Sequence, residues 1–147
     1  MTIYADTSFF LVLHLAGDGR HARALRAYEA NQDERWLWSP WHRVEVFNSI
    51  RQLPRQVGLP EAAAKQMIHL IEADVRVGYY DHMEADWRDV LRTANEISIG
   101  HSFAVPCRAA DLLHLAYARE LAATHFTGFD EDQLALAQAV GFEVIRP

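Results

Sequence analysis

Residues 2–10 read Thr-Ile-Tyr-Ala-Asp-Thr-Ser-Phe-Phe. The β-prone run Thr2–Ala5 ends abruptly in an acid, Asp6, and an apolar run whose spacing fits a helix follows two hydroxyl residues. In open α/β sheets, ligands bind outside the carboxyl ends of the strands, so a carboxylate here is placed for chemistry. The alternative is that Asp6 only caps the following helix, a role that aspartate performs well.

The rest of the chain alternates β-prone runs with helical patterns. The predicted helices cover Thr7–Ala16, Arg20–Asn31, Pro40–Leu53, Glu61–Asp74, His82–Ile99 (capped by Asp81), Arg108–Ala123 and Glu131–Val140. The predicted later strands are Arg35–Trp38, Arg76–Tyr80, Thr124–Thr127 and Phe142–Ile145. This alternation predicts an α/β fold with a short central parallel sheet of about five strands and helices on both faces. Right-handed crossovers then place the strand exits on one edge.

Length and composition are those of a soluble globular protein. The chain has 147 residues, and we expect one domain, residues 1–147. The longest apolar run, Phe9–Ala16, is far too short to span a membrane, and the N-terminus lacks the basic segment and cleavage site of a signal peptide. Cys107 is the only cysteine, which excludes an intramolecular disulfide and a thiolate metal cage. We therefore expect a cytoplasmic protein with no membrane association.

The net charge of −6 argues against the simple basic surface of many nucleic-acid binders. It does not exclude a nucleic-acid substrate. Clustered carboxylates make a protein acidic overall, and the divalent cations that they bind create a local positive site.

Four acids stand out by their positions. Asp6 and Asp130 each directly follow a β-prone run, while Glu45 and Asp111 lie early in predicted helices. The exits of parallel strands and the starts of the helices that follow them share one edge, so these carboxylates are expected to converge. Like charges at that density need compensation, and oxygen-only ligands suit Mg²⁺ or Mn²⁺.

Each acid also has a structural explanation. Asp111 follows Arg108 by three residues, which favours an ion pair within a helix, and Asp130 suits a turn. Glu45 has Arg43 and Arg51 as candidate salt-bridge partners. Asp132 is either a fifth acid of the site or a charge in the first turn of a helix. There is no zinc motif, and Ser8 has no evident base to make it a nucleophile.

Four stretches, in this order, resemble the PIN-domain ribonucleases, specifically the VapC-type toxins of type II toxin–antitoxin systems. They are Tyr4-Ala5-Asp6-Thr7-Ser8, residues 43–48 (RVEVFN), residues 108–116 (RAADLLHLA) and residues 126–130 (FTGFD). No single motif is specific, but the ordered set is, and it extends over nearly the whole chain.

The resemblance implies a three-layer α/β/α sandwich and metal-dependent hydrolysis of RNA phosphodiester bonds. Asp6, Glu45, Asp111 and Asp130 match the acidic quartet of the family, which implies that they are the catalytic residues and the ligands of Mg²⁺, with Mn²⁺ as a substitute. The sequence departs from the family at Gly128, where a Thr or Ser usually stands two residues before the last acid. Thr7 is the candidate to replace that hydroxyl.

The resemblance also implies partners: an RNA substrate, a small antitoxin protein and a second copy of the chain in a homodimer. The antitoxin is expected on the helices around Trp41 and Trp87, with a basic side chain in the acidic site. Aromatic residues available for these interfaces are Trp36, Trp38, Trp41 and Phe47, for which the alternative is core packing. Basic residues considered for RNA contacts are His14, Arg20, Arg43 and Arg108, of which Arg43 and Arg108 are expected instead to orient or neutralise the acids.

Two other protein classes, one of signalling modules and one of enzymes, fit the sequence less well. A receiver-type signalling module needs an acidic doublet after the first strand and a lysine after the last site strand, whereas Thr7 follows Asp6 and Lys65 lies within a predicted helix. A haloacid-dehalogenase-like phosphatase needs a second Asp where Ser8 stands. A catalytically inactive PIN module that binds RNA or protein remains the alternative within the family.

Overall fold

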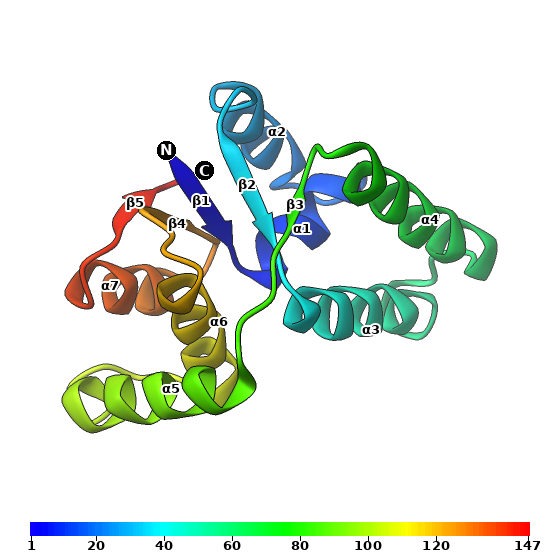
Figure 1. The fold of residues 1–147 in the computed structure, drawn as a ribbon. Coiled ribbons are helices and arrows are strands. Elements are labelled where there is room, and N and C mark those ends of the chain that lie inside the picture. The colour runs from blue at the N-terminus through cyan, green and yellow to red at the C-terminus, as the bar shows by residue number, and fades with distance from the viewer.

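The structure, a computed structural model of residues 1–147, is a sheet of five parallel strands between two layers of helices (Figure 1). This confirms the predicted α/β/α class. None of the helices combines the length and the apolarity needed to cross a membrane. In chain order the elements are β1 (Thr2–Ala5), α1 (Thr7–His14), α2 (His21–Glu29), β2 (Arg35–Trp38), α3 (Pro40–Val57), α4 (Glu61–Val77), β3 (Asp81–His82), α5 (Trp87–His101), α6 (Ala109–Glu120), β4 (His125–Thr127), α7 (Glu131–Ala139) and β5 (Glu143–Ile145).

The strand order, β3-β2-β1-β4-β5, places β1 at the centre of the sheet. The chain winds outward from β1 to β3 and then crosses back to β4 on the other side of β1. The order therefore reverses between β1 and β4, and the crevice outside their carboxyl ends is where open α/β sheets bind ligands. Ala5 pairs with Thr127 at the ends of these strands, so Asp6 and Gly128 leave the sheet side by side.

Alternate residues of the strands build two separate cores. Ile3 and Ala5 of β1 face α1, α2, α3 and α4, whereas Tyr4 faces α5, α6 and α7. Figure 1 shows the same division, with the first four helices on one side of the sheet and the last three on the other. The central strand therefore contributes side chains to both cores.

Most of the aromatic side chains considered as interface residues are core residues. Trp36, Trp38 and Phe47 are at most 3% exposed and belong to the core beneath α1 to α4. Trp41 is half-buried and packs edge-on against the exposed Trp87 of α5, with ring centroids 6.2 Å apart. Only this pair remains available to a partner.

Two predicted boundaries in the middle of the chain are wrong. The predicted strand Arg76–Tyr80 is the end of α4 and a turn, because Gly78 in the left-handed region (φ +87°) ends the helix and the N–H of Tyr79 donates to Asp74 O. The strand follows as the two-residue β3. Helix α5 begins at Trp87 rather than His82, because the carboxylate that caps it belongs to Asp86 and not to Asp81.

Candidate active site

Asp6 is the first residue after β1. Its backbone N–H donates to the carbonyl of Thr127 (2.9 Å), which ties it to β4. Its carboxylate accepts hydrogen bonds from the N–H of Phe9 and the hydroxyl of Ser8, each at 2.8 Å. Asp6 is therefore the N-cap of α1, as the structural alternative predicted, and the same bonds fix a carboxylate that is only 5% exposed at the exit of the central strand.

The surroundings of Asp6 disfavour its ionised form. Burial raises the pKa of Asp6, and the negative charge of Glu45 acts in the same direction. His114, the N–H of Phe9 and the hydroxyl of Ser8 lower the pKa but do not outweigh burial. A cation beside Asp6 would relieve this cost, because an opposite charge within a few ångströms favours the charged form.

Glu45 lies in the second turn of α3 and is held from two other helices. The Nε2 atom of His114 in α6 donates to Glu45 Oε2 at 2.5 Å, and the Thr7 hydroxyl of α1 donates to the same oxygen. Burial acts to raise the pKa of Glu45, but His114 and Thr7, with the charge of Arg108, outweigh it and hold the pKa below its ordinary value. Glu45 is thus an ionised carboxylate close enough to Asp6 for their charges to interact.

Asp111 stands in the first turn of α6 and is 8% exposed. Its carboxylate accepts from the backbone N–H of Arg108 (2.8 Å) and from the guanidinium of the same residue (3.3 and 3.4 Å). The predicted helical ion pair is confirmed. The Arg108 side chain is exposed at the rim, where Asp111 first and then Asp130 and Glu45 raise its pKa.

Asp130 is the exposed N-cap of α7, and its Oδ1 accepts from the N–H groups of Asp132 and Gln133 at 3.0 and 3.1 Å. Its charge acts on Arg108 together with those of Asp111 and Glu45, so it faces the same rim. Asp132 is exposed and contributes only a backbone N–H to this cap.

We expect Asp130→Ala to lower the stability of the fold by about 1 kcal/mol, which at this chain length lowers the thermal midpoint by about 2–4 °C. Asp130→Asn should leave the midpoint nearly unchanged, because Asn caps helices as well as Asp. Thermal denaturation followed by circular dichroism measures both. Equal losses for Asn and Ala would show that the charge, not the cap, is what Asp130 contributes.

Three of the four predicted acids line one cavity of about 240 Å³. Asp6, Glu45 and Asp111 contribute to its wall, whereas Asp130 does not. The remaining lining residues are Thr7, Ser8, Leu11, Ser49, Arg108, His114 and Gln133. The convergence predicted from the strand exits and helix starts therefore holds for three acids and places the fourth outside the cavity wall.

The chain matches the model of the PIN domain over residues 3–139. It belongs to the PIN domain family. Among solved structures, the chain is similar to the crystal structure of the VapC20 toxin of Mycobacterium tuberculosis, described as a sarcin-ricin loop cleaving toxin. The two are 26% identical, the match covers 99% of this chain and 100% of the toxin, and the TM-score is 0.70. No curated protein matches the chain significantly.

Two residues that line the acidic cavity of this PIN domain were not predicted from the sequence. His114 is 2% exposed and bonds directly to Glu45; its position three residues after Asp111 puts it on the same face of α6, a signal that was available. Gln133 is 3% exposed, and its Nε2 atom has no hydrogen-bond partner. A buried donor without a partner is costly, and at a cavity wall it points to an oxygen-bearing ligand.

The donors of the cavity fit a hard divalent cation in chemistry but not yet in arrangement. They are carboxylate and hydroxyl oxygens, which Mg²⁺ and Mn²⁺ prefer. No three His, Cys, Asp or Glu side chains stand close enough together to hold a metal ion as they are placed. The reason is visible in the bonds above, since each carboxylate is turned to the nearest N–H, hydroxyl, imidazole or guanidinium.

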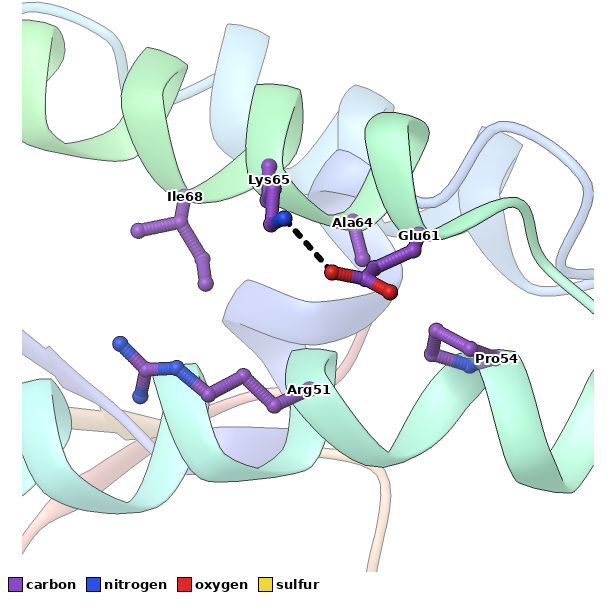
Figure 2. A pocket seen from close by; sticks show the side chains of 6 residues that line it. All are labelled: Arg51, Pro54, Glu61, Ala64, Lys65 and Ile68. Atoms are coloured by element: carbon purple, nitrogen blue, oxygen red, sulfur yellow. Dashed lines mark ion pairs between the residues drawn. The ribbon is translucent and has the colours of Figure 1, made fainter.

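A larger cavity of about 480 Å³ lies between α3 and α4 and shares no residue with the acidic cavity (Figure 2). Arg51 and Pro54 line it from α3, while Glu61 and Lys65 of α4 form an ion pair across its edge at 2.6 Å. Its only carboxylate is that of Glu61, and it is already paired. The acids of the family's quartet therefore select the smaller cavity, although other cavities of the structure are larger.

The structure contradicts the predicted position of Arg43 beside Glu45 and disfavours a charged His14. Arg43 pairs with Glu72 of α4 and not with Glu45, and Arg51 forms no ion pair with Glu45 either. His14 lies against the hydroxyl of Tyr80 (3.0 Å), and burial lowers its pKa to about 4, so it carries no charge for a phosphate at neutral pH. Arg20 is exposed and pairs with Asp18, and its contact with RNA stays a prediction.

Proposed function

We propose that this chain is a metal-dependent endoribonuclease and the toxin of a type II toxin–antitoxin system. The observation that carries the proposal is the meeting of Asp6, Glu45 and Asp111 at one cavity, outside the carboxyl ends of the central strands of a PIN domain. The similarity to a toxin described as cleaving the sarcin-ricin loop supports RNA as the substrate. The implied partner is a small antitoxin, for which the half-buried Trp41 and the exposed Trp87 are a candidate contact, and a homodimer is the expected assembly.

In this proposal Asp6, Asp111 and Glu45 hold Mg²⁺, or Mn²⁺ in its place, and Asp130 completes the site from outside through water. Such a cation polarises a phosphoryl oxygen and lowers the pKa of a bound water. The chain itself positions the reactants: Asp6 is fixed by the cap of α1, Glu45 by Thr7 and His114, and Asp111 by Arg108. The exposed guanidinium of Arg108 at the rim is available to a phosphate of the RNA backbone.

The first test is cleavage of an RNA oligonucleotide with the sequence of the sarcin–ricin loop. We expect cleavage with Mg²⁺ or Mn²⁺, none with EDTA, and full recovery when Mn²⁺ is added back in excess. Glu72→Gln is the matched control, since it removes a half-buried acid that pairs with Arg43 outside the cavity, and it should leave the rate within about twofold.

One observation favours the inactive PIN module as the second candidate: the acids do not form a ready group of metal ligands. That module would bind RNA without cutting it. A folded, antitoxin-free protein that stays inert across metals and a panel of structured RNAs would support it, and EDTA-resistant cleavage would contradict the metal mechanism.

A further inference from the structure

His114 occupies the position between the acidic cavity and the interior of the protein. Its Nε2 atom donates to Glu45 at 2.5 Å and lies 3.0 Å from the Thr7 hydroxyl. Its Nδ1 atom lies 3.1 Å from the hydroxyl of Tyr4, which is fully buried. Since a carboxylate can only accept, the hydrogen on Nε2 is directed at Glu45, and both ring nitrogens have fixed partners.

The Tyr4 hydroxyl continues into a second buried group. It lies 3.4 Å from the hydroxyl of Ser39, the N-cap of α3. The Nδ1 atom of His42 accepts from the backbone N–H of Ser39 at 2.9 Å, and its Nε2 donates to the carbonyl of Ala5 at 2.7 Å. These partners require the neutral Nε2–H tautomer of His42, in agreement with the burial that holds its pKa well below the ordinary value.

This buried network therefore extends from Glu45 to the backbone next to Asp6. It begins at Glu45, passes through His114, Tyr4, Ser39 and His42, and ends at the carbonyl of Ala5, the residue before Asp6. The four polar side chains between its ends are at most 2% exposed. Buried networks in which every member has a partner are rigid, because any rotation leaves a buried polar atom unpaired.

We propose that His114 is a positioning residue of the active site, which aims the Glu45 carboxylate into the acidic cavity so that it can bind the divalent cation. The inference rests on the proposed function and adds to it a residue outside the acidic quartet. Glu45 stands on the half-buried face of a helix, and its side chain has several rotamers; two donors from two other helices select one of them. Groups that orient a metal-binding carboxylate typically change metal affinity or activity about 10–100-fold when removed.

The competing explanation is that His114 only fills space in the interior beside the rings of Tyr4, Trp41 and His42. Two substitutions separate these roles. His114→Leu keeps an apolar side chain of similar size and removes the donor to Glu45. His114→Gln places an amide N–H near the position of Nε2 and so restores that donor. A purely structural role does not distinguish the two variants by metal binding.

The experiment measures Mn²⁺ binding to the metal-free protein by calorimetry, beside the Mg²⁺ concentration that gives half-maximal RNA cleavage. We expect His114→Leu to weaken Mn²⁺ binding and to raise the Mg²⁺ requirement about 10–100-fold. His114→Gln should recover most of both losses. The exposed His69→Leu is the control for loss of a histidine and should equal wild type.

Tyr4→Phe covers the case in which His114→Leu does not fold. It removes only the hydroxyl beside Nδ1, and we expect a weaker loss of Mn²⁺ affinity in the same direction. Unchanged Mn²⁺ affinity in His114→Leu or in Tyr4→Phe, or equal losses in His114→Gln and His114→Leu, would overturn the proposal. A wild type that binds Mn²⁺ but cuts no RNA contradicts the proposed function alone, because the binding comparison between variants still stands.

Discussion

Asp6→Asn should abolish metal-dependent cleavage and, at neutral pH, make the metal-free protein more stable than wild type. Loss of an ionised ligand removes several kcal/mol of charge stabilisation, so we expect the rate to fall by at least about 10²–10³-fold. Stability should rise because Asn still caps α1 and accepts from Phe9 and Ser8, while the buried negative charge disappears. Single-turnover cleavage and thermal denaturation in EDTA measure the two effects.

The difference in stability between Asp6→Asn and wild type should depend on pH in a defined direction. Because the pKa of Asp6 is raised in the folded protein, the folded state binds the proton more tightly than the unfolded chain. The favourable contribution of the protonated carboxyl is complete below the unfolded value and is lost as the pH rises through the folded value. The advantage of Asp6→Asn should therefore be small below the unfolded pKa, about 3.9, and largest near neutrality. Each kcal/mol moves the midpoint by about 2–4 °C, which is measurable.

Asp111→Asn is the matched comparison. It should lose cleavage to a similar extent without gaining stability, because the charge of Asp111 is compensated by the guanidinium and the N–H of Arg108. If Asp6→Asn cuts RNA as well as wild type, the site lies elsewhere. If Asp6→Asn loses cleavage but is less stable than wild type at every pH, the buried charge of Asp6 does not destabilise the fold.

The parts of the site that follow from local sequence were predictable, and those that depend on long-range packing were not. Asp6 and Asp111 occupy cap positions next to a strand and a helix start, which a short stretch of sequence is enough to identify. The contact between Glu45 and His114 joins residues 69 positions apart, and it forms only because α3 and α6, on opposite faces of the sheet, both begin at its carboxyl edge. Gln133 likewise reaches the cavity only because α7 lies against β4 and β5.

The wrong predictions have equally specific causes. Arg43 was expected beside Glu45, but residues two positions apart point to different sides of a helix, so Arg43 reaches Glu72 on the neighbouring α4 instead. The edge strand β3 has only two residues, too few to show the alternation by which strands are recognised. The run Arg76–Tyr80 has such an alternation, but its first two residues complete the last turn of α4 and the others form the turn that follows.

Gly128→Ala should damage the site although it changes no acid. A Cβ atom at Gly128 would lie 2.8 Å from Asp6 Cγ and 2.9 and 3.0 Å from its two carboxylate oxygens, closer than real Cβ atoms come. Asp6 cannot move away freely, because its N–H is bonded to Thr127 and its carboxylate to Phe9 and Ser8. Gly128, which departs from the Thr or Ser of the family, is therefore the residue that makes room for Asp6 beside β4.

We expect Gly128→Ala to destabilise the fold by about 1–3 kcal/mol, as overpacking does, and to reduce cleavage and Mn²⁺ affinity by at least about tenfold, since a displacement near 1 Å is enough to misplace a catalytic group. Gly100→Ala is the matched control, because its Cβ meets open space within α5 and should stabilise the helix by roughly 0.5–1 kcal/mol. Denaturant unfolding and the cleavage assay check both. A Gly128→Ala protein with wild-type stability and activity would mean that β4 or Asp6 yields at little cost, and the close contact would then have no part in fixing the first acid of the site.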